Sequence, residues 1–199
     1  MLTERILMQS SSGKYKSLVI TGMLLAVGLV LPFLTGQIQA IAKTISPLHI
    51  PVLICGLCCG WKWGMGLGIV LPLLRSLLFG FPPFPTNALP MVFELAVYGL
   101  ITGLLYPALI KSKKRSHLTA MYMSLVPAMI LGRIAGGAAK ALFITIGVIG
   151  SSSPYTFAAF FSGYFASTAV GAVIHLILVP AVVLAIESAG LSPVSGGKR

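Results

Sequence analysis

Five ionisable side chains lie inside or at the edge of long apolar stretches of this sequence. They are His49, Arg75, Glu94, Arg133 and Lys140. A charged side chain near the centre of a transmembrane helix costs at least about 2.5 kcal/mol on insertion scales, so such residues face the bundle interior. A cation held there attracts a carboxylate or a phosphate. The chemistry that these residue types offer is therefore the binding of an anion.

The same residues also allow a purely structural interpretation. Arg75 and Glu94 are predicted to form an ion pair, because a lone buried charge is less favourable than a paired one. This pair leaves Arg133 and Lys140 without an acid in the membrane, since Glu187 is expected near the cytoplasmic end of the last span. Arg133 lies too deep to reach the interface, which favours a binding role. For Lys140, snorkelling to the outer interface and ligand binding both remain open.

Composition indicates that lipid is the solvent for most of the chain. Of its 199 residues, 57% are hydrophobic and only 9% are charged, whereas soluble domains carry about a quarter charged residues. The net charge is +11, but no water-facing basic surface exists to carry nucleic acid, which is not an expected partner. These features predict an all-α integral membrane protein.

The apolar runs predict six transmembrane helices. Their approximate ranges are 17–35, 48–60, 64–79, 87–110, 118–149 and 155–186. The second is too short to cross in straight form, so it either crosses with help from its loop or is re-entrant. The last two exceed the ~20 residues that a bilayer needs, which predicts tilt, bends or protruding ends. The chain then divides into an N-terminal arm, a membrane domain and a polar tail, at residues 1–16, 17–187 and 188–199.

The basic residues predict the orientation of the bundle. With six spans both termini share one side, which collects nearly all Lys and Arg of the loops and ends, whereas the opposite loops hold only Lys43. The positive-inside rule then places both termini in the cytoplasm. At ~1.5 Å per residue, Arg75 lies about 20 Å above the inner end of its span. By similar counting, all five ionisable residues converge on the outer half of the bundle.

The remaining polar groups have simpler interpretations. His175 is expected to be a packed, hydrogen-bonded histidine rather than a proton carrier, and His117 to be solvated in a cytoplasmic loop. Cys55, Cys58 and Cys59 are expected to pack as small apolar residues, because a zinc site needs four ligands. No catalytic or nucleotide-binding motif is visible. We therefore expect no enzyme activity, no metal and no cofactor.

Four short segments follow one another in a characteristic order. They are Leu48-His49-Ile50-Pro51-Val52, Leu71-Pro72-Leu73-Leu74-Arg75-Ser76, Phe93-Glu94-Leu95-Ala96-Val97-Tyr98-Gly99 and Leu131-Gly132-Arg133. Together with the length and the number of spans, they resemble the substrate-binding S components of energy-coupling factor (ECF) vitamin transporters. The resemblance implies a six-transmembrane-helix bundle of the ECF S-component type in a bacterial cell membrane. It also implies a vitamin site in the outer half, covered by the loop between the first two spans.

The same resemblance implies partners. ECF transporters combine an S component with one membrane scaffold subunit and two ATPases, and the S component is thought to topple in the membrane with its ligand. In the family, a small-residue motif on the first helix, typically Ala-x-x-x-Ala, docks on the scaffold. Here Gly22 and Ala26 stand at the matching positions. Small side chains at this spacing allow close helix approach.

The vitamin is predicted from the excess of positive charge in the site. A carboxylate-bearing vitamin fits best, with pantothenate first and folate second, and the hydroxyls and amide of pantothenate could use Asn87, Tyr98 and Glu94. A neutral vitamin such as pyridoxine, or hydroxymethylpyrimidine, remains an alternative if the charges pair differently. A self-sufficient secondary carrier or channel, or a membrane enzyme or assembly scaffold, are further alternatives. The expected aromatic walls are Phe93, Tyr98, Tyr155 and Phe157.

Overall fold

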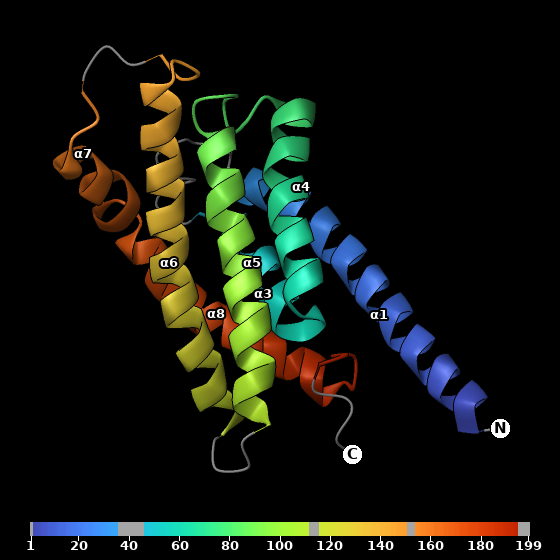
Figure 1. Ribbon diagram of the computed structural model, residues 1–199. Coiled ribbons are helices and arrows are strands. Elements are labelled where there is room, and N and C mark those ends of the chain that lie inside the picture. The colour runs from blue at the N-terminus through green and yellow to red at the C-terminus, as the bar shows by residue number, and fades with distance from the viewer. Residues whose placement is uncertain (1, 36–45, 112–115, 151–153, 195–199) are drawn as a thin grey trace.

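Helices α4, α5 and α6 lie side by side, with α1 leaning away at one edge and α8 crossing behind them (Figure 1). The computed structural model describes residues 2–35, 46–111, 116–150 and 154–194. The helices are α1 (Leu2–Val30), η1 (Leu31–Thr35), α3 (His49–Cys59), α4 (Trp61–Phe79), α5 (Ala88–Ile110), α6 (His117–Thr145), α7 (Phe157–Phe161), η2 (Ser162–Ala166) and α8 (Ala169–Ser188). Within these described ranges no strand occurs, so the predicted all-α class is confirmed.

Five helical segments of the described chain are long and apolar enough to cross a membrane. They are Gly13–Phe33, Trp61–Phe79, Ala88–Ile110, His117–Thr145 and Phe157–Ser188. They correspond to the first, third, fourth, fifth and sixth predicted spans, and the chain is a multi-pass membrane protein. Helix α1 differs at its start, because it begins at Leu2 and runs through the residues predicted to form an N-terminal arm.

The short second span is a central helix enclosed by others. All 11 residues of α3 are buried, and the helix contacts α1, α4, α5 and α8. Its rise of about 16 Å, at ~1.5 Å per residue, is about half the thickness of a bilayer core. Gly60, with a φ of 88°, then turns the chain directly into α4, a conformation that glycine adopts without a Cβ penalty. The apolar surface of α3 therefore serves protein packing rather than contact with lipid.

Glycines let α4 and α5 approach closely. A Cβ added to Gly99 would collide with the backbone of Gly64, and a Cβ on Gly68 would collide with the carbonyl group of Leu95. Gly64 and Gly68 form one of the small-residue ladders of the sequence, and their role is internal packing of the bundle. This contact fixes the position of α5, which carries much of the candidate site.

The sixth span is not one continuous α-helix. A π-helical segment, η2, separates α7 from α8, and two hydroxyls bond back to the turn before them. Ser167 Oγ donates to the carbonyl of Gly163 at 2.8 Å, and Thr168 Oγ1 donates to that of Tyr164 at 2.6 Å. Such side-chain bonds compete with the regular helix ladder, and π segments occur often at functional sites. The bend predicted for an over-long span is confirmed here.

The start of α1 and the end of α8 lie at the same end of the bundle as the end of α5 and the start of α6 (Figure 1). A polar cluster joins three helices there. Tyr106 on α5 donates to Glu187 Oε1 at 2.6 Å, and His117 Nδ1 lies 3.0 Å from Glu187 Oε2. The prediction that His117 is only solvated is therefore wrong, because the fold brings the one acid of α8 next to it.

Candidate ligand-binding site

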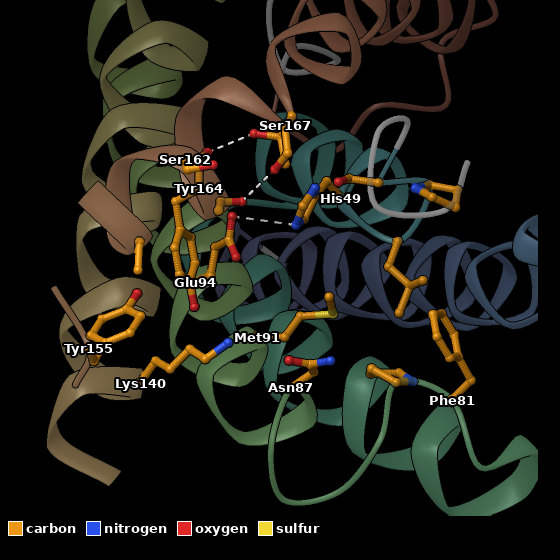
Figure 2. A pocket seen from close by; sticks show the side chains of 17 residues that line it. His49, Phe81, Asn87, Met91, Glu94, Lys140, Tyr155, Ser162, Tyr164 and Ser167 are labelled. Atoms are coloured by element: carbon orange, nitrogen blue, oxygen red, sulfur yellow. Dashed lines mark hydrogen bonds and ion pairs between the residues drawn. The ribbon is translucent and has the colours of Figure 1, made fainter. Parts of the chain in front are cut away.

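A cavity of about 370 Å³ lies beside the start of α5, at the end of the bundle opposite the start of α1 and the end of α8 (Figure 2). Its volume falls within the range of about 300–1,000 Å³ that is usual for small-molecule sites. The start of α3, the 80–87 loop, the first turns of α5, the outer part of α6 and the α7–η2 segment form its walls. Its polar lining residues include His49, Asn87, Glu94, Lys140, Tyr155, Ser162, Tyr164, Ser167 and Thr168.

One face of α5 supplies the floor of this cavity. The 80–87 loop contains three prolines and ends in a turn. In this turn the backbone N–H of Asn87 donates to the carbonyl of Pro83 at 2.9 Å. Asn87, Met91 and Glu94 then follow at a spacing of four and three residues, which places them on the same side of the helix. All three line the cavity. The turn therefore sets where α5 begins, and the helical period carries its polar groups to the cavity.

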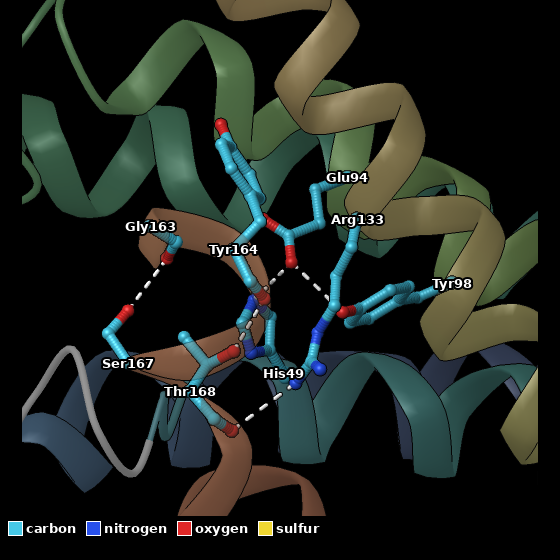
Figure 3. A network of polar contacts seen from close by, with 8 residues as sticks. All are labelled: His49, Glu94, Tyr98, Arg133, Gly163, Tyr164, Ser167 and Thr168. Atoms are coloured by element: carbon cyan, nitrogen blue, oxygen red, sulfur yellow. Dashed lines mark hydrogen bonds and ion pairs between the residues drawn. The ribbon is translucent and has the colours of Figure 1, made fainter. Parts of the chain in front are cut away.

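Glu94 is the acid of the site and is held by two neighbours. The hydroxyl of Tyr98, a fully buried residue, donates to Glu94 Oε1 at 2.9 Å. His49 Nε2 lies 3.6 Å from the same oxygen. Figure 3 shows the three side chains converging, with Tyr98 approaching from α5 and His49 from α3. The ring of His175, a residue only 1% exposed, packs edge-to-face on His49 with 5.5 Å between ring centroids, so the packing predicted for this histidine is confirmed.

Arg75 is not the partner of Glu94, and the predicted ion pair between them is wrong for the described part of the chain. Its Nη1 donates to the carbonyl of Leu29 in the last turn of α1. Its guanidinium lies 5.2 Å and 5.3 Å from the ring centroids of Phe33 and Phe79. Arginine commonly stacks on aromatic rings and caps helix C-termini. Arg75 therefore joins α1 to α4, and the described lining of the cavity does not include it.

Arg133 is buried behind Glu94 rather than exposed to lipid. Its side chain lies beside those of Tyr98 and Glu94 (Figure 3). Its Nη2 donates to the carbonyl of Thr168 at 3.4 Å, and its guanidinium lies 5.6 Å from the ring centroid of Phe165. Arg133 extends from α6 and packs behind the wall of the cavity, but it is not among the described residues that line the cavity. Its positive charge still acts on Glu94 at short range.

Among the described residues that line the cavity, Lys140 is the one that carries a positive charge at neutral pH. Its ammonium group points toward Asn87 and Met91 (Figure 2). Tyr155 stands next to it, and burial raises the pKa of the Tyr155 phenol above its usual value. That hydroxyl therefore stays protonated at neutral pH and is able to donate a hydrogen bond.

Several lining residues were not singled out by the sequence as ligand contacts. They are Phe81, Met91, Ser162, Tyr164, Ser167 and Thr168. A usable signal was the cluster of hydroxyl-bearing residues in the first half of the sixth span, since polar groups are sparse within apolar spans. Two predicted aromatic walls lie elsewhere, because Phe93 is 48% exposed and Phe157 is 77% exposed.

The structure thus divides the predicted site residues into three groups. His49, Asn87, Glu94 and Lys140 line one cavity, and Tyr98 reaches it through Glu94. Arg75 and Arg133 contact other parts of the protein and are not among the described residues that line the cavity. The predicted docking residues, Gly22 and Ala26, are exposed on α1, and a Cβ added to Gly22 would meet no atom within 4 Å.

A family model described as the substrate-specific component of ECF transporters matches residues 16–183. This range includes the central helix, the whole cavity lining and all of the predicted site residues. No curated protein and no solved structure matches the chain.

Proposed function

This chain belongs to the family of substrate-specific components of ECF transporters, and from that premise we propose that it captures a small anionic vitamin. Pantothenate is the first candidate and folate the second. Members of the family are substrate-binding subunits that work with ECF scaffold and ATPase subunits. We take the driving energy for uptake to come from those ATPases and not from this chain.

The observation that supports an anionic ligand is the position of Lys140. Its ammonium points into the cavity, so a positive charge lies where a ligand would bind. Inside a protein cavity the effective dielectric constant is lower than in water, so an ammonium interacts with a carboxylate more strongly there than in solution. Lys140 is therefore the residue that selects the anionic group of the ligand.

Cavity size favours the first candidate over the second. At about 370 Å³ the cavity lies near the lower end of the usual range for ligand sites. Pantothenate fits this volume more easily than folate, which has about twice as many non-hydrogen atoms. Asn87 and Tyr155 offer donors and acceptors for its amide and hydroxyls.

The direction of capture follows from the distribution of basic residues. Lys62 and Lys111 are exposed at the end of the bundle opposite the cavity, and Lys14 and Lys16 belong to the N-terminal half of α1. By the positive-inside rule that end is cytoplasmic, with both termini inside a bacterial cell. The cavity then opens to the outside, as capture of an external vitamin requires.

Ligand binding by the purified chain tests this proposal. Thermal-shift and calorimetric titrations should give binding of pantothenate, and Lys140→Gln should weaken it by at least tenfold, which is about 1.4 kcal/mol. Lys62→Gln is the matched control, because Lys62 lies at the other end of the bundle and should leave affinity unchanged. Binding of pyridoxine with no binding of pantothenate or folate would contradict the anionic assignment.

The proposal of an ECF-dependent subunit is tested separately in liposomes. The chain alone should bind the vitamin but not accumulate it against a gradient. Ion-coupled uptake by the chain alone would favour a secondary carrier instead. Uptake that appears only with scaffold, ATPases and ATP would support the proposed role.

A further inference from the structure

The cavity holds two side chains of opposite charge, Glu94 on α5 and Lys140 on α6. Resting on the proposed function, in which Lys140 binds an anionic group, we propose that the ligand also carries a hydrogen-bond donor that docks on Glu94 Oε2. The ligand class is then an acid that bears a hydroxyl or an N–H group, and a simple carboxylic acid is excluded.

The two oxygens of Glu94 have different surroundings. Oε1 accepts from Tyr98 at 2.9 Å and lies 3.6 Å from His49 Nε2. Oε2 accepts no hydrogen bond from the described residues, although Glu94 is only 6% exposed. Glu94 lines the cavity, so Oε2 is the carboxylate oxygen that a ligand group there can reach. A ligand O–H or N–H group at Oε2 would supply the hydrogen bond that the described residues do not.

Hydrogen-bond donors and positive charges surround the carboxyl group of Glu94. The Tyr98 hydroxyl donates to Oε1, and the guanidinium of Arg133 lies beside the carboxyl group (Figure 3). Lys140 adds a second positive charge on the cavity side. We take Oε2 as an acceptor in these surroundings, so the ligand group that completes it is a donor.

Two other lining groups also lack hydrogen-bond partners. Both ring nitrogens of His49, a residue only 3% exposed, make no hydrogen bond within the described structure, and the same is true of the Tyr155 hydroxyl. Both residues line the cavity together with Glu94. Buried polar groups in folded proteins are normally satisfied, so these groups together indicate a polar ligand with several hydrogen-bonding atoms.

The geometry also gives the ligand an orientation. The Lys140 ammonium points toward Asn87 and Met91, which precede Glu94 on the same face of α5 (Figure 2). At ~1.5 Å per residue, these positions lie about 5–10 Å from Glu94 along the helix axis. The anionic group of the ligand therefore lies nearer the loop end of the cavity and its donor lies deeper. A separation of about 5–10 Å between the two groups spans several bonds.

Matched ligands test this inference on the unmodified full chain. The probes are pantothenate and its analogue with hydrogen in place of both hydroxyls, each titrated calorimetrically in detergent. Loss of the hydroxyls should weaken binding by at least tenfold, and in Glu94→Leu, which has no acceptor, the two ligands should bind within threefold of each other. Thermal unfolding of Glu94→Leu shows whether that variant is folded, and the comparison on the unmodified chain does not depend on it.

The outcomes separate this inference from the proposed function. Equal affinity for the two ligands in the unmodified chain overturns the donor requirement and leaves the anion site standing. A tenfold difference that persists unchanged in folded Glu94→Leu assigns the hydroxyls to another residue and overturns the role of Glu94. If neither pantothenate nor folate binds the unmodified chain, the proposed function and this inference fail together.

Discussion

The hydroxyl of Tyr98 donates a hydrogen bond to Glu94 Oε1 at 2.9 Å, one turn away on the same helix. Tyr98 is fully buried, and its ring lies so close to Gly132 of α6 that a Cβ there would collide with it. Tyr98, whose ring is fixed by packing, thus holds the carboxylate of Glu94 in position through Oε1. The second carboxylate oxygen is left for the cavity, which is what the ligand proposal requires.

Replacement of Tyr98 by phenylalanine removes this hydrogen bond and keeps the ring. Because Glu94 Oε1 then loses a donor in a buried place, we expect a loss of about 1–3 kcal/mol in stability. Thermal unfolding in detergent measures it. Tyr122→Phe is the matched control, because Tyr122 is 42% exposed on α6 and its loss should be within about 0.5 kcal/mol. Equal effects of the two substitutions would show that the Tyr98 hydroxyl is unimportant.

Gly136 is predicted to leave the space that the carboxyl group of Glu94, including Oε2, occupies. A Cβ at this position would lie 2.9 Å from Glu94 Cβ, 3.0 Å from a ring carbon of Tyr164 and 3.3 Å from Glu94 Oε2. Gly136→Ala should therefore push the carboxylate out of place and weaken ligand binding by about tenfold or more. Calorimetric titration measures the effect.

The control for this substitution is Gly66→Ala on α4, where an added Cβ meets no atom within 4 Å. Alanine in an open helical position is at least as stable as glycine, so binding by this variant should be unchanged. Unaltered affinity in Gly136→Ala would mean that the site relaxes around the methyl group.

Arg75 is predicted to stabilise the fold without touching the ligand. Its Nε and Nη2 make no hydrogen bond within the described residues, so its contacts with Phe33, Phe79 and the Leu29 carbonyl hold it in place. Arg75→Lys keeps the charge and loses the planar stacking, which should cost about 1–2 kcal/mol in thermal unfolding. Ligand affinity should change by less than threefold. A large loss of ligand affinity at unchanged stability would show that Arg75 takes part in ligand binding.

The cluster of Tyr106, His117 and Glu187 is predicted to hold α5, α6 and α8 together at the end of the bundle opposite the cavity. Tyr106→Phe removes the donor and Glu187→Leu removes the acceptor of the 2.6 Å hydrogen bond. Because they act on one contact, the double variant should lose less stability than the sum of the single ones, by about 0.5–3 kcal/mol. Thermal unfolding of the four proteins gives this coupling energy, and strict additivity would contradict the contact.

Docking on the scaffold is predicted to depend on the small side chain of Gly22. The residue is exposed on α1, and nothing lies within 4 Å of its added Cβ. Gly22→Trp should leave ligand binding intact and abolish ATP-dependent uptake in liposomes that contain the scaffold and ATPases, because a large side chain blocks close helix approach. Gly22→Ala should remain active. Normal uptake by Gly22→Trp would move the docking surface elsewhere on the chain.

The sequence alone was enough for the helical class, the approximate span boundaries and the resemblance to ECF S components. Long apolar runs form helices in lipid because every backbone polar group has to be satisfied within the chain. The same runs located Glu94 and Lys140 at depths that bring them to one end of the bundle. Depth along a helix follows from residue counting, because each residue adds the same rise.

Only the tertiary structure decided which charge meets which partner. Counting along the chain placed Arg75 and Glu94 in the same half of the bundle, yet Arg75 contacts Phe33, Phe79 and α1, whereas Glu94 contacts Tyr98 and His49. The bend at η2, which brings hydroxyls to the cavity, likewise depends on local hydrogen bonds. The physical reason is that the rotation of a helix about its axis, and the neighbour it faces, are set by contacts such as that of Gly64 with Gly99. Those contacts join residues far apart in the chain, and no count along a single helix contains them.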